Sequence, residues 1–184
     1  MTYQTIQINL YEDLLTEFGN DLTKWDATLN QNTLSIVFNA PEILFDKSTA
    51  LLKDNFKEIL NDFFPRYINL IESKYKDELE EIRIEGYTDS DGIKGNTEHQ
   101  NYFYNMQLSQ DRTRHVLEYC MTLTGSSDKF KWLSNKITAN GLSFSHLKFY
   151  QDGVEDKERS RRVEFRVKTK ADTKIRKIIE TMQQ

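Results

Sequence analysis

Apolar residues at helical spacing mark two long segments in the first half of the chain. Between residues 10 and 25, apolar side chains recur every three or four positions, and this period predicts an amphipathic helix. A second stripe of the same period runs from Leu52 to Leu70, and Ser48 can cap the helix that it predicts. Because proline lacks the N–H that a helix interior uses, we expect a kink or a break at Pro65.

Alternation of apolar and polar residues indicates the strands. Residues 27–40, "ATLNQNTLSIVFNA", predict two short strands around a turn at residues 30–32. In "EIRIEGYTD", residues 81–89, every second residue is apolar or glycine, as in a half-buried strand that ends near Thr88. The segments "KITANG" and "RRVEFRVKT" predict two further strands, the second of which is the last in the chain.

A polar stretch and one more helix lie between these strands. Residues 90–107 contain two glycines and are predicted to form a long loop. The helix that follows is predicted to begin at Ser109, which can cap it. Arg112 lies in line with the apolar stripe of this helix, which contains Leu108, Val116 and Cys120. A guanidinium in such a stripe needs a carboxylate partner, water or a ligand.

Together these elements predict an α/β sandwich of order β-α-β-α-β-β, with helices packed on one face of a mixed sheet. Extra helices are expected at both ends of the chain. We expect an N-terminal helix and hairpin extension in residues 1–32, the sandwich domain in residues 33–168, and a C-terminal helix in residues 169–184.

The composition favours a folded globular protein, since 38% of the 184 residues are apolar and 12% are aromatic. The net charge of −4 gives no field that favours nucleic acid, and we interpret "KERSRR", residues 157–162, as a solvated strand edge. Cys120 is the single cysteine, which excludes an internal disulfide, and its place on the apolar stripe predicts a buried thiol. The sequence contains neither a signal peptide nor an apolar run long enough to span a bilayer.

Three motifs stand at the ends of the predicted elements. They are Gly86-Tyr87-Thr88-Asp89, Asn105-Met106-Gln107-Leu108-Ser109-Gln110-Asp111-Arg112 and Ser160-Arg161-Arg162-Val163. With them, residues 33–168 resemble the OmpA-like peptidoglycan-binding domain of OmpA-type outer-membrane proteins and MotB-type stator subunits. The segment "ILFDKSTALL", residues 43–52, also resembles the strand-to-helix connection of this family. The long helix before "EIRIEGYTD" and the tail "RRVEFRVKTKADTKIRKIIE" resemble the stator-subunit branch of this family. Within that branch, the segments "TANGL" and "SRRVEFRV" resemble the B subunits of Zorya anti-phage systems.

The resemblance implies non-catalytic binding of the diaminopimelate in the peptide stem of the cell wall, with no cofactor and no metal. A free diaminopimelate centre carries an ammonium, which Asp89 would hold, and a carboxylate, which Arg112 would bind with two hydrogen bonds. The helix N-terminus expected near Arg112 would add partial positive charge. Matching the family position by position adds further residues to the pocket, namely Thr88, Asn105, Arg161 and Asp46.

The resemblance also implies a periplasmic location and a membrane-anchored full-length protein. Its expected role is to attach a membrane protein or a stator complex to the cell wall, as a homodimer with an ion-channel partner subunit. Two residues depart from the family motifs, because Tyr87 replaces a histidine and Ser160 replaces an asparagine. In the predicted loop, the aromatic residues 102–104 either pack onto the domain or contact sugar rings.

The sequence is also compatible with two other classes of function, an interaction module and a metal-dependent hydrolase. The terminal helices could serve a protein–protein interaction or dimerisation module. A metal-dependent hydrolase would use carboxylate and imidazole ligands from the set Asp89, Asp91, His99, His115 and His146. The spacing of this set matches no metal-site pattern, and "DSDGIKGNTE" places a glycine too early for a calcium loop. We interpret His115 as a surface residue.

Overall fold

The computed structural model describes residues 3–39, 44–45 and 49–170. The expected C-terminal helix falls almost entirely outside these residues. The named elements, in chain order, are α1 (Tyr3–Leu22), β1 (Ala27–Asn30), β2 (Ser35–Phe38), α3 (Asp54–Tyr75), β3 (Leu79–Tyr87), α4 (Glu98–Thr122), α5 (Ser127–Ser134), β4 (Ile137–Gly141), α6 (Lys157–Ser160) and β5 (Arg162–Thr169).

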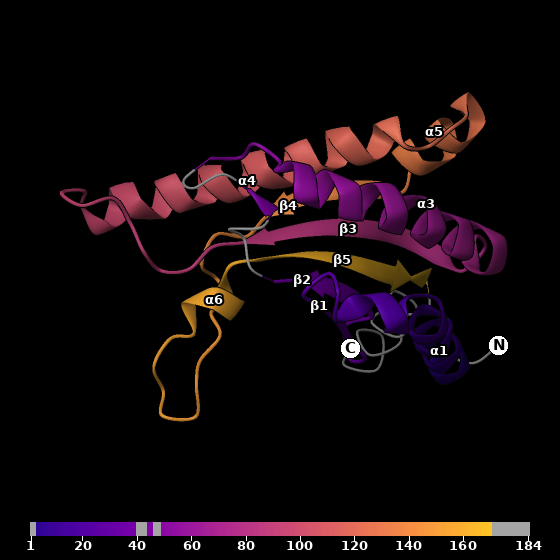
Figure 1. Ribbon diagram of the computed structural model, residues 1–184, viewed down its shortest axis with the longest axis horizontal. Helices are drawn as coiled ribbons and strands as arrows, with labels where there is room; N and C mark the ends of the chain where they lie inside the picture. Colours follow the sequence, from indigo (N-terminus) through magenta and orange to yellow (C-terminus); the bar gives the residue numbers. More distant parts are fainter. Residues whose placement is uncertain (1–2, 40–43, 46–48, 171–184) are drawn as a thin grey trace, which may run out of the picture.

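The five strands form one mixed sheet of order β1-β2-β5-β3-β4 (Figure 1). β3 and β4 are parallel, and the other neighbouring strands are antiparallel. The last strand therefore inserts between strands that come much earlier in the chain. Phe165 of β5 lies opposite Ile36 on one side and Ile84 on the other, so apolar side chains from three strands share one face of the sheet.

The helices α1, α3 and α4 bury their apolar residues against that face, as the predicted α/β sandwich requires. Phe63 of α3 is central, with its ring centroid 5.1 Å from that of Phe38 in β2 and 5.0 Å from that of Phe165 in β5. Phe18 of α1 joins the same cluster, 5.2 Å from Phe63. Cys120 of α4 is fully buried in it, which confirms the prediction for the single thiol.

Arg66 of α3 makes several polar and aromatic contacts with α1. The Nε of Arg66 donates to Glu17 Oε1 at 2.8 Å, and its Nη1 donates to Asp21 Oδ2 at 3.0 Å. The guanidinium also lies over the Phe18 ring, 5.0 Å from its centroid. Arg66 thus combines ion pairs with a cation–π contact, and the apolar residues of α1 belong to the same core as those of the sheet.

One expectation about α3 was wrong, namely the cap at Ser48, and of the kink or break expected at Pro65 the break does not occur. Lys53, and not Ser48, occupies the cap position before Asp54, and it provides no side-chain cap. The helix also continues through Pro65 without a break. Pro65 removes one backbone hydrogen bond, but the buried rings of Phe63, Phe64 and Tyr67 hold the turns on both sides against the sheet.

α4 begins at Glu98, well before the start predicted at Ser109. Thr97 caps it in a capping box, in which Gln100 N donates to Thr97 Oγ1 at 3.2 Å and Thr97 N donates to Gln100 Oε1 at 2.8 Å. The predicted loop 90–107 therefore shrinks to residues 88–97, and the aromatic residues 102–104 lie on the helix. Ser109 is not a cap, and Arg112 lies in the middle of α4.

Two glycines allow α4 to lie very close to the sheet. A Cβ atom at Gly141 of β4 would stand 2.3 Å from the backbone nitrogen of Gln110. A Cβ atom at Gly86 of β3 would stand 2.6 Å from Thr113 Cγ2 and 3.1 Å from the Ser109 carbonyl oxygen. Any larger side chain at these positions would push the middle of α4 away from β3 and β4.

We predict that Gly141→Ala lowers the free energy of unfolding by roughly 2 kcal/mol, because its Cβ overlaps backbone rather than a flexible side chain. Urea denaturation measures this change. Gly19→Ala in α1 is the control, since its Cβ would make an ordinary 3.5 Å contact with Leu15 and alanine favours a helix. Equal stability of Gly141→Ala and the wild type would show that α4 does not depend on this close approach.

Candidate functional site

The predicted site residues gather where β3 ends. Thr88 and Asp89 directly follow β3, Asn105 and Arg112 lie on α4, and Arg161 precedes β5. Arg161 Nε lies 3.5 Å from Asp89 Oδ2, and both residues act electrostatically on Arg112. Asn105 Nδ2 donates to the carbonyl oxygen of Asp91 at 2.8 Å, which ties α4 to the loop. The sixth predicted residue, Asp46, lies outside the described residues.

Asp89 is a buried carboxylate with only 6% of its surface exposed. Its Oδ1 accepts a hydrogen bond from Asp91 N at 3.1 Å. Burial raises the pKa of Asp89 above its ordinary value, and the nearby charges of Asp91 and Glu155 raise it further. The Asp91 amide and Arg161 only partly oppose this shift. A cation that bound beside Asp89 would therefore stabilise its charged form.

Arg112 is also buried, with 8% of its surface exposed, and its direct contacts are with uncharged groups. Its Nε donates to the Thr49 carbonyl oxygen at 2.9 Å, and its guanidinium carbon lies 4.8 Å from the centroid of the Phe45 ring. Burial lowers the pKa of Arg112 to about 10, and the like charge of Arg161 lowers it too, against opposing contributions from Tyr104 and Asp89. No carboxylate of the described residues forms an ion pair with Arg112, so this buried cation is suited to an anionic ligand.

The prediction that a helix N-terminus lies beside Arg112 is wrong. Glu98 starts α4, so the backbone amides around Arg112 are already bonded within the helix and offer no free N–H groups. The cavity beside Arg112 has a volume of about 10 Å³ and is lined by Phe45, Ser109 and neighbouring residues. This space holds roughly one water molecule. Since Arg112 is only 8% exposed, a ligand reaches little of its guanidinium in this conformation.

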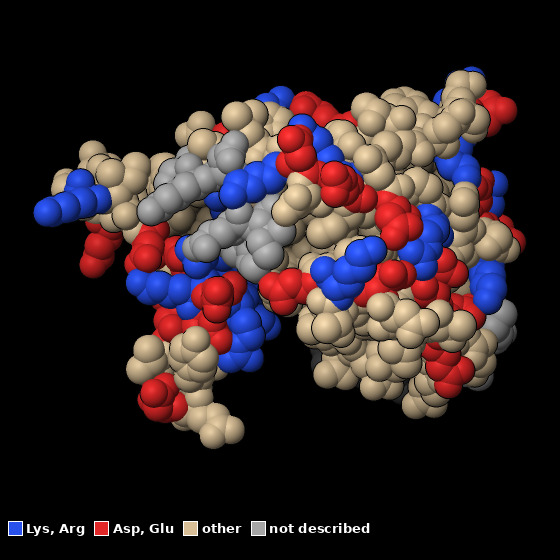
Figure 2. Space-filling model, in the orientation of Figure 1, with Lys and Arg blue, Asp and Glu red and all other residues tan. Residues whose placement is uncertain are grey.

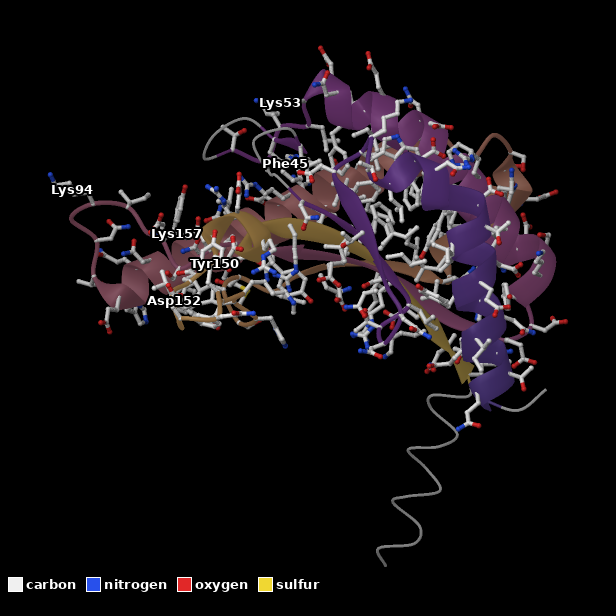
Figure 3. All side chains as sticks on the ribbon, turned by 60° about the horizontal axis from the view of Figure 1, so that its bottom comes forward. Phe45, Lys53, Lys94, Tyr150, Asp152 and Lys157 are labelled. Atoms are coloured by element: carbon white, nitrogen blue, oxygen red, sulfur yellow. The ribbon has the colours of Figure 1, made fainter. Side chains whose placement is uncertain are left out.

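Two hydrogen bonds and one ion pair hold the loop that carries Asp89. Glu155 accepts hydrogen bonds from the backbone and the hydroxyl of Ser90. Lys157 Nζ lies 2.5 Å from Asp91 Oδ1, and this bond raises the pKa of Lys157. Figure 3 places Lys157 and Tyr150 at the same end of the molecule as Lys94, which lies in this loop. No motif or periodicity predicts these contacts, whose partners are more than sixty residues apart along the chain.

The two arginines of the third motif have different surroundings. While Arg161 approaches Asp89, the guanidinium of Arg162 lies over the Tyr87 ring, 3.7 Å from its centroid. Arg162 Nε also donates to Glu164 Oε1 at 2.7 Å, and Arg162 is only 4% exposed. The tyrosine that departs from the family motif thus packs against a buried arginine. Ser160, the other departure, accepts a hydrogen bond from Lys148 N at 2.9 Å.

The residues considered for a metal-dependent hydrolase are not brought together. Within the described part of the chain, no three carboxylate, imidazole or thiol side chains gather in a group suited to a metal ion. His115 is half-buried, and its Nδ1 lies 2.8 Å from the Ala50 carbonyl oxygen, so our interpretation of it as a surface residue was wrong. His146 packs against Tyr87, with ring centroids 5.8 Å apart.

The fold and this site define an OmpA-like α/β domain with a buried acidic and basic pair at the end of its central strands. Comparison with known proteins agrees, because the OmpA family matches residues 44–161. The chain is also 41% identical to the Zorya protein ZorB of Escherichia coli strain Crooks, over 98% of this chain and 76% of that protein. The chain belongs to the OmpA family.

Solved structures share the fold at lower identity. A MotB-like protein from Desulfovibrio vulgaris superposes with a TM-score of 0.59 at 22% identity, over 89% of this chain and 91% of that one. The cell wall anchor of the type VI secretion system from Pseudomonas aeruginosa gives a TM-score of 0.57 at 20% identity, over 85% and 97% of the two chains. The resemblance to OmpA-like domains of the stator B-subunit branch is confirmed. Among the described residues, no helix has both the length and the apolarity to cross a bilayer.

We predict that Asp89→Asn stabilises the protein at pH 7. Burial raises the pKa of Asp89 in the folded state, so its ionised form weakens folding above that pKa, and the penalty fades as pH falls toward the unfolded value of about 3.9. The melting temperature of Asp89→Asn should exceed that of the wild type by about 2 °C at pH 7, with a smaller gap at pH 4. Glu118→Gln, on the exposed side of α4, should show no such trend. A lower melting temperature for Asp89→Asn at pH 7 would contradict the assignment of Asp89 as a strained charge.

Proposed function

We propose that this domain binds peptidoglycan without catalysing a reaction, by holding the diaminopimelate of the stem peptide. The observation that carries the proposal is the buried pair of Asp89 and Arg112 at one end of the sheet, each with a pKa shifted against its charged form. A buried charge is usually stabilised by an oppositely charged side chain of the protein. For Asp89 and Arg112, we propose that the charged groups of a ligand supply this stabilisation.

The charges of the site match a zwitterionic ligand. Asp89 contributes one negative charge, and the guanidinium groups of Arg112 and Arg161 contribute two positive charges near it. The ammonium of diaminopimelate would pair with Asp89, and its carboxylate would take the fork of Arg112, with Arg161 close to both groups. Thr88 and Asn105 would line the same pocket. Asp46 stays in the proposal on its sequence position alone.

The biological role follows from the family and from the named relatives. We infer that the domain lies in the periplasm and anchors a membrane complex to the cell wall. By analogy with ZorB and MotB, that complex would be a stator with an ion-channel partner subunit, which serves anti-phage defence in the Zorya case. A homodimer is supported by two exposed apolar residues of α1, Ile8 and Leu15, seven positions apart on one side of the helix.

We predict that Asp89→Asn and Arg112→Gln each abolish binding to purified sacculi, because each removes the charge that one group of the ligand requires. Co-sedimentation with sacculi measures this loss. Arg114→Gln is the matched control, since this arginine lies on the exposed side of the same helix, paired with Glu118. Wild-type levels of sacculus binding by either folded site variant would rule out the pair as the ligand site.

The site should also discriminate between stem peptides. A lysine side chain ends in an ammonium alone, so it would leave the buried guanidinium of Arg112 without an anion. We predict that diaminopimelate peptides bind at least roughly tenfold more tightly than lysine peptides, a difference of about 1.4 kcal/mol. Amidation of the diaminopimelate carboxylate should weaken binding as well. Calorimetry with the three peptides is the measurement, and equal affinities would show that Arg112 does not bind the carboxylate.

A further inference from the structure

Exposed aromatic side chains gather at the end of the molecule that holds the candidate site. Tyr102 and Phe103 on α4 are 43% and 56% exposed, and Phe149 and Tyr150, before α6, are 56% and 52% exposed. In Figure 1, the first turns of α4 and the long connection before α6 both project beyond the sheet at this end. By contrast, Phe130, which is 46% exposed, lies on α5 at the opposite end.

Both aromatic pairs are connected to the loop that carries Asp89. Tyr102 lies one turn before Asn105, whose side chain bonds to the backbone of Asp91. Phe149 pairs through its backbone with Glu155, which holds Ser90. The four rings therefore flank the candidate site and are fixed to its framework.

The rings on α4 form an ordered surface. Helical spacing places His99, Tyr102 and Phe103 on one side of α4, with 4.8 Å between the ring centroids of His99 and Phe103. The rings of Tyr102 and Phe103 lie 5.2 Å apart at 85°, and Tyr102 also contacts Phe144 at 6.0 Å. A capped helix holds these side chains, so little conformational entropy is lost when a ligand covers them.

The chemistry of this end favours a saccharide. Figure 2 shows acidic and basic side chains interspersed beside the projecting segment before α6, and the ion pairs of Lys157 with Asp91 and of Arg159 with Asp156 neutralise them locally. The rings thus stand among polar groups and do not form one broad apolar patch. A sugar ring presents the matching pattern, with C–H groups on its faces and hydroxyls around its edge. Its C–H groups carry a partial positive charge that suits the negative face of an aromatic ring.

From this geometry we infer that the aromatic side chains Tyr102, Phe103, Phe149 and Tyr150 form a binding surface for the glycan strand of peptidoglycan. The inference rests on the proposed function. A stem peptide is only a few residues long and extends by at most about 3.5 Å per residue. When its diaminopimelate occupies the site of Asp89 and Arg112, the sugar to which the peptide is attached must therefore pass close to these rings.

The test uses the double variant Tyr102→Ala/Phe103→Ala. Both side chains are exposed and alanine favours a helix, so α4 keeps its structure. Phe130→Ala is the matched control, because it removes an equally exposed ring from the opposite end. Two soluble probes separate the two parts of the ligand. One is glycan strands freed of stem peptides by an amidase, and the other is a diaminopimelate tripeptide without sugar.

The double variant should bind the peptide-free glycan at least roughly tenfold more weakly than the wild type, while its affinity for the tripeptide stays within about twofold. Phe130→Ala should match the wild type with both probes. The inference is overturned if the wild type does not bind the glycan, if the double variant binds it equally well, or if the double variant loses both probes together. A wild type that binds the glycan but not the tripeptide would contradict only the proposed function.

Discussion

The close contact of α4 with β3 and β4 determines where the site residues lie. Gly86 and Gly141 leave room for the helix backbone, and a chain of hydrogen bonds then joins the three elements. Thr88 N donates to the Ser143 carbonyl oxygen at 2.9 Å, and Ser143 N donates to Ser109 Oγ at 3.0 Å. These bonds involve the backbone of Thr88, next to Asp89, and the side chain of Ser109, one turn before Arg112. The fold therefore fixes the two charges without a direct bond between them.

This arrangement costs stability at the site. Burial works against the charged forms of both Asp89 and Arg112, and the groups around them do not fully compensate. The large aromatic core around Phe63 contributes folding stability that offsets this cost. Binding of one ammonium and one carboxylate would reverse both penalties at once. The same features that weaken the free domain would therefore favour a zwitterionic ligand over a singly charged one.

Alternation of apolar and polar residues predicted the strands and the class of fold, and the resemblance carried by the three motifs predicted that Asp89 and Arg161 lie near Arg112. The start of α4 could not be found from periodicity. Its first turns project beyond the sheet, so they need no apolar stripe, and only the capping box of Thr97 and Gln100 marks them. The contacts of Glu155 and Lys157 with the loop had no sequence signal at all, since they depend on how the segment before β5 folds back.

The adjacent arginines before and in β5 have different structural surroundings although they belong to one short motif. Neighbouring residues of an extended chain point to opposite sides, so Arg161 and Arg162 cannot share one environment. Arg162 is held by a cation–π contact with the Tyr87 ring and a hydrogen bond to the Glu164 carboxylate, and both contacts stabilise the sheet. These contacts fix the backbone on either side of Arg162. The neighbouring Arg161 is thereby directed toward Asp89, with its Nε 3.5 Å from Asp89 Oδ2. The contacts of Arg162 thus help to position Arg161 beside Asp89.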